Sequence, residues 1–235
     1  MKKLLFGFAW LFGLSTGVQA QVKLGLKIMP QLTWTTVETK NLKADANYFN
    51  FAYGLILDKH FSENYSISTE IVIANFKGDL KPQNTTLVRN GANPSSDVSY
   101  EYSLQYFSVP LYLKMRTNEI GYLRYYAEFG LNNCFLGRAR ADVSSSSVNL
   151  TDVNINDPDD ADKFDLTNSN GKNLEDEVNI YRASLLVGAG IQYNAFANTM
   201  LFGGVRYDRG FTSFTKESSW DARLNGLCLN VGVLF

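Results

Sequence analysis

The sequence contains few of the residues that proteins use for metal binding and acid–base catalysis. Its 235 residues include one histidine, His60, and two cysteines, Cys134 and Cys228. A single histidine excludes a metal site with two imidazole ligands, and any catalytic triad would depend on His60 alone. We expect His60 to be a surface residue of a turn. We expect the cysteines to be free and buried, although an exported chain could oxidise them to a disulfide. We therefore predict no enzymatic activity, no metal and no cofactor.

The sequence also lacks an excess of charge. It has 22 Lys and Arg against 23 Asp and Glu, so no basic surplus attracts nucleic acid. After the first twenty residues, no segment is apolar over the roughly 20 residues that a transmembrane helix needs. Aromatic residues are abundant instead, with 13 Tyr and 16 Phe, and they cluster near the ends of the predicted strands described below.

Residues 1–20 have the organisation of a secretory signal peptide. Two lysines precede an apolar run at 4–14, and small residues then lead to Ala20. We predict cleavage between Ala20 and Gln21, export, and a single mature domain over 21–235. An exported, aromatic-rich chain without apolar helices is either a periplasmic β protein or a β-barrel in the outer membrane of a Gram-negative bacterium.

The dominant pattern in the rest of the chain is an alternation of apolar and polar residues, which recurs in eight segments. In residues 107–115, for example, apolar residues at odd positions alternate with Ser108, Pro110, Tyr112 and Lys114. Successive side chains of a strand point to opposite faces, so each segment has one apolar face and one polar or small-residue face. The predicted strands are 22–37, 48–59, 65–77, 100–116, 121–138, 178–194, 199–215 and 222–235.

The predicted connections alternate between longer links, at 38–47, 78–99 and 139–177, and short links, at 60–64, 117–120 and 195–198. The last link, 216–221, is short but falls on the side of the longer ones. Transmembrane barrels have short periplasmic turns and longer extracellular loops. We therefore predict an all-β fold, an eight-stranded antiparallel up-and-down β-barrel that spans the outer membrane.

Alternation alone does not decide whether the apolar faces meet lipid or meet inside a soluble barrel. The polar faces favour lipid contact, because they combine glycines with ionised residues of both signs, which suit a narrow interior. Buried charges are costly unless they are paired. We expect Glu70 and Glu128 to pair with three cations inside a plugged lumen, namely Lys114, Arg124 and Arg206. The full predicted lumen network is Lys27, Glu70, Lys114, Arg124, Glu128, Arg206 and Asp208.

Two strand residues carry further expectations. Phe235 ends the last predicted strand with apolar residues at alternate positions before it, which is typical of the signal read by the barrel assembly machinery. Pro110 cannot donate a ladder hydrogen bond, and a closed barrel has no edge to accommodate it, so we expect a local bulge there.

One long link carries an acidic segment at 154–162. It lacks the ligand spacing and the glycine of an EF-hand. A solvated loop explains the segment, and the sharper hypothesis is a loop in which Ca²⁺ or Mg²⁺ bridges to lipid phosphates or a partner.

The segments 22–28, 53–57, 61–67, 107–114 and 230–235 occur in an order that resembles the PorT family of outer-membrane β-barrel proteins. The family's namesake acts in the type IX secretion system, which exports proteins across the outer membrane. The resemblance therefore implies a structural or accessory component of the envelope or of protein secretion, and it implies no catalytic motif. We expect as partners outer-membrane lipid and lipopolysaccharide, the barrel assembly machinery and secretion-system components. Two alternatives stay open, a ligand-binding or adhesin-like barrel that acts through its loops and a narrow small-solute porin.

Overall fold

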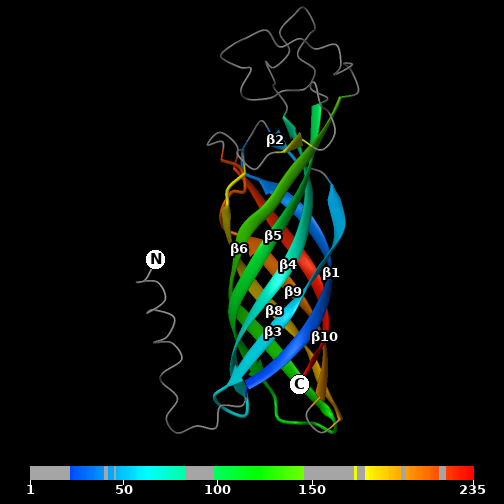
Figure 1. Cartoon of the computed structure of the whole chain (residues 1–235), viewed down its shortest axis with the longest axis vertical. Helices are drawn as coiled ribbons and strands as arrows, with labels where there is room; N and C mark the ends of the chain where they lie inside the picture. Colours follow the sequence, from blue (N-terminus) through cyan, green and yellow to red (C-terminus); the bar gives the residue numbers. More distant parts are fainter. Residues whose placement is uncertain are drawn as a thin grey trace, which may run out of the picture.

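The computed structural model describes residues 22–39, 42–44, 46–82, 98–145, 172–173, 178–196, 199–216 and 221–235 as an all-β protein (Figure 1). Within these residues, the long strands are β1 (Val22–Val37), β3 (Asn47–His60), β4 (Tyr65–Pro82), β5 (Val98–Arg116), β6 (Leu123–Ser145), β8 (Tyr181–Phe196), β9 (Thr199–Gly210) and β10 (Ala222–Leu234). The two-residue strands β2 (Leu42–Lys43) and β7 (Lys172–Asn173) pair with the far ends of β4 and β6.

The eight long strands form a closed antiparallel barrel. Each pairs with its neighbour along the chain, and β1 pairs with β10 to close the cylinder. The last residue takes part in this closure, because the Phe235 amide donates to the Leu24 carbonyl at 2.7 Å. The predicted fold class is confirmed. The predicted strand ends differ most at β4 and β6, which run on to Pro82 and Ser145, and at β9, which stops at Gly210.

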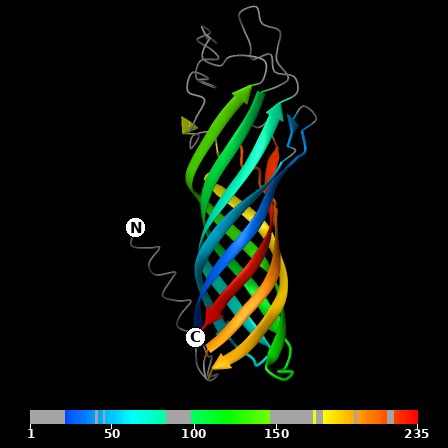
Figure 2. The ribbon, with the colours of Figure 1, turned by 90° about the vertical axis from the view of Figure 1, so that its right-hand side faces the viewer.

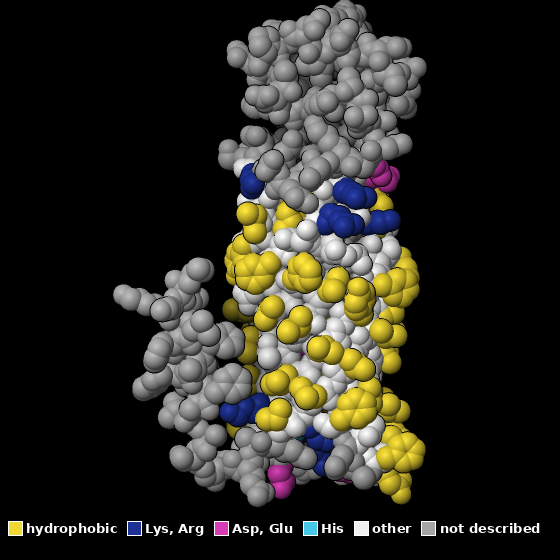
Figure 3. All heavy atoms as spheres, viewed as in Figure 1, with side chains coloured by type: hydrophobic (Ala, Val, Ile, Leu, Met, Phe, Trp, Pro, Cys, Tyr) yellow, Lys and Arg dark blue, Asp and Glu magenta, His cyan; other side chains and the backbone are white. Residues whose placement is uncertain are grey.

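The outer wall of the barrel is apolar. Figure 3 shows hydrophobic side chains covering the wall between Lys and Arg residues at its two ends. We call this wall the apolar belt, and its members include Leu24, Ile28, Tyr53, Leu55, Ile67, Ile71, Leu111, Phe129, Leu131, Ile191, Val205 and Leu229. Ile71 is 62% exposed and Leu24 is 59% exposed. Soluble monomers rarely expose a continuous apolar surface of this size, whereas the hydrocarbon of a bilayer covers one. The predicted outward orientation of the apolar faces is confirmed. The described residues include no helix long and apolar enough to cross a membrane.

Beyond the belt, at the end with the longer links, the pattern of the wall reverses. The ends of β4, β5 and β6 project past the other strands there (Figures 1 and 2). Their inward side chains are apolar and fully buried, and with residues of the neighbouring segments they form what we call the upper core: Phe76, Leu80, Tyr102, Leu104, Tyr106, Ala139, Phe214 and Leu224. Their outward side chains include Lys77, Ser103 and Arg140, all exposed.

Water explains this reversal, because the projecting part has water rather than lipid outside it and therefore buries its apolar residues inside. The expectation of a polar interior applies to the belt and is wrong for this end of the barrel.

Pro110 does not cause the expected bulge. It pairs with Asn132 of β6, and the β4–β5 register is the same on both sides of it. The Thr69 hydroxyl donates to the Pro110 carbonyl at 3.0 Å, so a side chain of β4 adds a hydrogen bond between the two strands beside the position where proline supplies no N–H. The register shift in this strand lies instead between Gln105 and Tyr106, where the upper core begins.

Candidate functional site

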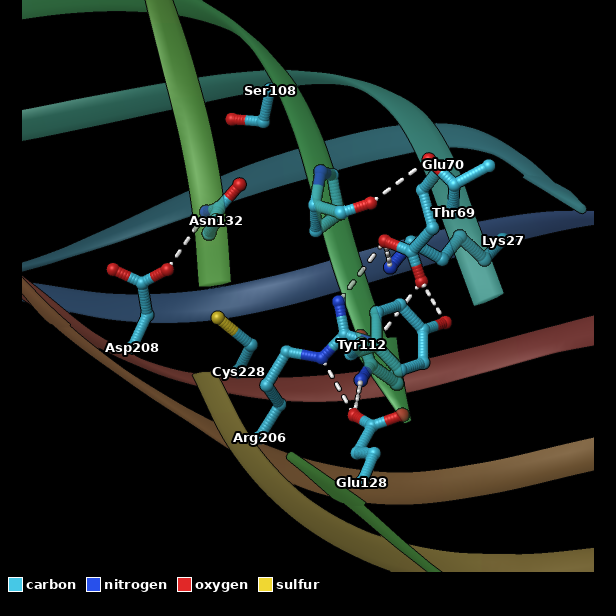
Figure 4. Close-up of polar contacts among 12 residues, drawn as sticks. Lys27, Thr69, Glu70, Ser108, Tyr112, Glu128, Asn132, Arg206, Asp208 and Cys228 are labelled. Atoms are coloured by element: carbon cyan, nitrogen blue, oxygen red, sulfur yellow. Dashed lines mark hydrogen bonds and ion pairs between the residues drawn. The ribbon is translucent and has the colours of Figure 1, made fainter. Parts of the chain in front are cut away.

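The lumen inside the belt is crossed by an arginine held between two carboxylates. Arg206 of β9 donates through Nε to Glu128 of β6 at 2.6 Å. Its two terminal nitrogens donate to the two oxygens of Glu70 on β4, each at 3.0 Å. Figure 4 shows the guanidinium lying between the two acids, which come from separate strands. All three side chains are buried, so one planar fork ties together strands on different sides of the barrel.

Two further donors complete the coordination of Glu70. Lys27 of β1 donates from Nζ to Oε2 at 2.5 Å, and the Tyr112 hydroxyl donates to Oε1 at 2.5 Å. Each oxygen of Glu70 therefore accepts two hydrogen bonds. We call Lys27, Glu70, Glu128 and Arg206 the central ion cluster. It contains two cations and two anions, which satisfies the requirement that buried charges be paired and hydrogen-bonded.

A balanced ion pair lies on each side of the central ion cluster. Toward the upper core, Arg182 donates to Asp208 at 2.6 Å, and Asn132 and Ser184 donate to the same carboxylate. Toward the short turns, Lys114 pairs with Asp58 at 2.7 Å. The Arg182–Asp208 layer is neutral by itself. At the end with the short turns, Lys23 and Arg116 are also buried, so the cations there outnumber the buried acid Asp58.

A small cavity separates the central ion cluster from Asp208. Its lining includes Glu70, Asn132, Arg206 and Asp208, and its volume is about 20 Å³. That volume has room for about one water molecule. Buried side chains of the three charged layers occupy the described part of the lumen on both sides of this cavity.

Glycines of β8 and β9 make room for two long side chains of β6 that cross the lumen. A Cβ at Gly188 would lie 2.6 Å from Oε1 of Glu128. A Cβ at Gly190 or at Gly204 would lie 2.5 or 2.4 Å from the Tyr126 hydroxyl. These contacts are closer than van der Waals packing allows, so β8 and β9 carry glycine where Glu128 and Tyr126 of β6 reach across.

The structure places six of the seven predicted lumen charges inside the barrel and one at its end. Arg124 is the exception, because it lies next to the turn after β5 and pairs with Glu119 of that turn at 3.2 Å. Its side chain is 28% exposed. Lys114 lies in the lumen but pairs with Asp58 rather than with Glu70 or Glu128. The expected pairing of the two glutamates with Lys114 and Arg124 is therefore wrong. Their expected pairing with Arg206 is observed, and Lys27 is the second cation.

Sequence reasoning missed several lumen residues, among them Asp58, Tyr112 as a hydrogen-bond donor, Arg116 and Arg182. They occupy inward positions of the alternation, which was the available signal. Their partners lie on strands far apart in the sequence, so alternation could indicate membership of the lumen but not the pairing.

The histidine and the cysteines lie inside the barrel. His60 is the last residue of β3 and is buried, which corrects the expectation of a surface position. Neither ring nitrogen of His60 has a hydrogen-bond partner among the described residues. Cys134 and Cys228 are free and buried, as predicted.

The remaining expectations concern the chain ends and the acidic link. The Phe235 side chain points outward and is 57% exposed, and its part as an assembly signal stays a prediction. Ala20, Gln21 and the acidic segment 154–162 lie outside the described residues. Among the residues that are described, no group of three His, Cys, Asp or Glu side chains could hold a metal ion.

The filled lumen predicts that the barrel does not conduct ions. We expect the purified chain to give no steady single-channel current in a planar bilayer, because an ion would have to cross three ion-paired layers whose separation leaves buried charges unpaired. A wide porin in the same membrane is the positive control. Reproducible unitary currents from the wild-type chain would contradict a sealed lumen.

Comparison with known proteins agrees with the architecture. The model of the outer membrane protein beta-barrel domain family matches residues 7–216. A search of curated proteins found no match.

Solved structures of similar shape include three bacterial surface barrels. Neisserial surface protein A is 12% identical, with 91% of this chain and 97% of that one covered and a TM-score of 0.47. Ail, the attachment invasion locus protein of Yersinia pestis, is 15% identical, with 93% and 100% covered and a TM-score of 0.41. The outer membrane protein OprG from Pseudomonas aeruginosa is 10% identical, with 93% and 96% covered and a TM-score of 0.46.

Proposed function

Because the chain belongs to the outer membrane protein beta-barrel domain family, we propose that it is a sealed, non-enzymatic barrel that serves protein secretion as an accessory component. The family places the barrel in the outer membrane of a Gram-negative bacterium. The central ion cluster carries the proposal, since it fills the space through which a porin would pass its solute. A sealed barrel acts through the surfaces at its ends rather than through its lumen.

The surface that best suits this role is the projecting end of β4, β5 and β6, which we call the surface platform. The upper core packs beneath it, with edge-to-face aromatic pairs between Phe76 and Tyr106 and between Tyr102 and Phe214. Such pairs add stability beyond their buried area. A packed core below a paired sheet holds a docking surface in one conformation, which lowers the entropic cost of binding a partner.

The link to secretion comes from the resemblance to the PorT family. The resembling segments include the Phe61–Tyr65 region, where the two rings stack at the end of the barrel with the short turns, and the β5 segment that contains Pro110. A secretion component needs a membrane-embedded body and an exposed surface for protein partners, and the barrel and the surface platform supply both.

A second candidate is an adhesin-like barrel that binds an external ligand. The observation that favours it is that the links 83–97 and 146–171 begin at the ends of β4 and β6, the strands that project farthest. Ligand binding would then depend on these links, whereas secretion would not require an external ligand. The filled lumen disfavours the third candidate, a narrow porin.

Deletion of the gene and comparison of the secreted proteome test the secretion role. We expect secreted proteins to accumulate in the periplasm of the deletion strain and to return to the medium when the wild-type chain is restored. Complementation with Glu101→Lys combined with Asp142→Lys, both exposed on the surface platform, should fail to restore secretion although the barrel assembles. An unchanged secreted proteome in the deletion strain would overturn the secretion role and leave the adhesin-like alternative.

A further inference from the structure

Three basic side chains gather on the outer face of the barrel just beyond the apolar belt. The outermost apolar pair of β5 and β6 on this face is Phe107 and Phe135, which are register partners. The next outward residues toward the surface platform include Arg138, and the row after that includes Lys77 and Arg140. All three cations are exposed. Figure 3 shows a group of Lys and Arg side chains in this zone, directly above the hydrophobic side chains.

Strand register places these cations close to one another. Ser103 of β5 pairs with Lys77 of β4 on one side and with Arg140 of β6 on the other. Adjacent strands are about 4.8 Å apart. The backbone positions of Lys77 and Arg140 are therefore about 10 Å apart, with the small, uncharged Ser103 between them. Arg138 lies two residues from Arg140 on the same face of β6, at about 7 Å. The three long side chains can therefore converge on one anionic group.

Among the described residues, no acid forms an ion pair with Lys77, Arg138 or Arg140. The outward row beyond them contains acids, among them Glu101, which is exposed and register-paired with Asp142. The barrel therefore has, in order along its outer wall, an apolar zone, a basic zone and an acidic zone. The basic zone lies at the depth where lipid tails give way to headgroups.

We propose that Lys77, Arg138 and Arg140 form a binding site for the phosphate groups of a phosphorylated glycolipid in the outer leaflet. Phosphate is the group that planar guanidinium donors bind best, and Arg in two of the three positions fits that chemistry. The location decides the source of the phosphate, because the end with the longer links faces the cell exterior. A soluble phosphate would not require the acyl-chain contacts that the Phe107–Phe135 pair offers directly below the cations.

Titration of the folded full-length chain with bisphosphorylated lipid A tests the site. The variant Lys77→Gln/Arg138→Gln/Arg140→Gln should bind at least tenfold more weakly, since each basic residue near an anionic lipid surface contributes roughly a fivefold factor. The matched control Lys43→Gln/Lys59→Gln/Arg209→Gln removes the same charge from exposed positions that are scattered over the barrel, and it should stay within twofold of wild type. Heat-modifiable electrophoretic mobility reports that each variant is folded.

Dephosphorylated lipid A separates the phosphate from the acyl chains. Wild type and the triple variant should bind it equally. If the triple variant does not fold, Arg140→Gln alone should weaken binding of the phosphorylated lipid about fivefold. Wild-type affinity in the cluster variants, an equal loss in the scattered control, or a loss that persists with dephosphorylated lipid A would each overturn the proposal. None of these outcomes depends on a role in secretion.

Discussion

Replacing Arg206 with methionine is expected to lower the free energy of unfolding by about 3–5 kcal/mol, the usual cost of removing one partner from a buried ion pair. Methionine keeps an unbranched apolar stem but lacks the guanidinium and donates no hydrogen bond. Glu70 would lose two donors and Glu128 would lose its 2.6 Å partner. The central ion cluster would then contain two carboxylates and only Lys27 to balance them.

Urea titration of the refolded barrel, followed by heat-modifiable mobility, measures this change. Arg124→Met is the matched control, because Arg124 pairs with Glu119 at a partly exposed turn, and such pairs contribute about 0–1 kcal/mol. Adding Glu70→Gln to Arg206→Met should recover part of the loss, since it removes one uncompensated charge. An Arg206→Met barrel as stable as wild type would show that the central ion cluster is solvated and that the lumen is open.

Replacing Leu111 with arginine is expected to destabilise the barrel in a bilayer by about 2–4 kcal/mol, the cost of a cation at the middle of the lipid face. Leu111 lies on the outer face of β5 within the apolar belt and is exposed to lipid. Ser103→Arg places the same side chain on the same face of the same strand, eight residues away and beyond the belt. Its cost should be about 1 kcal/mol or less, because no hydrocarbon covers this position and the like charges of Lys77 and Arg140 in the same row are the main penalty.

The comparison of the two arginine variants tests the orientation of the wall as well as the position of the membrane boundary. Folding into lipid vesicles, measured over a urea series, gives both free energies under one condition. Equal costs at the two positions would contradict a boundary between Phe107 and Ser103. A costly Ser103→Arg with a tolerated Leu111→Arg would reverse the orientation altogether.

The pairing inside the lumen is the part of the site that sequence reasoning could not reach. Lys114 and Glu128 are register partners on adjacent strands, and a sheet-based argument would pair them. Instead the ammonium of Lys114 reaches Asp58, while Glu128 binds Arg206. In a narrow cylinder, side chains cross the interior, so a partner can lie on another wall of the barrel as well as on a neighbouring strand.

Local alternation determined the eight strands, the apolar outer wall and the inward position of Glu70 and Arg206, because the side-chain period of a strand is a property of the backbone itself. The closed cylinder decided the rest. It set which charges meet across the lumen, it left Arg124 at a turn, and it extended β4, β5 and β6 into water, where the same alternation buries apolar residues instead of exposing them. These outcomes depend on the stagger of the strands and on the solvent at each height, which no single segment encodes.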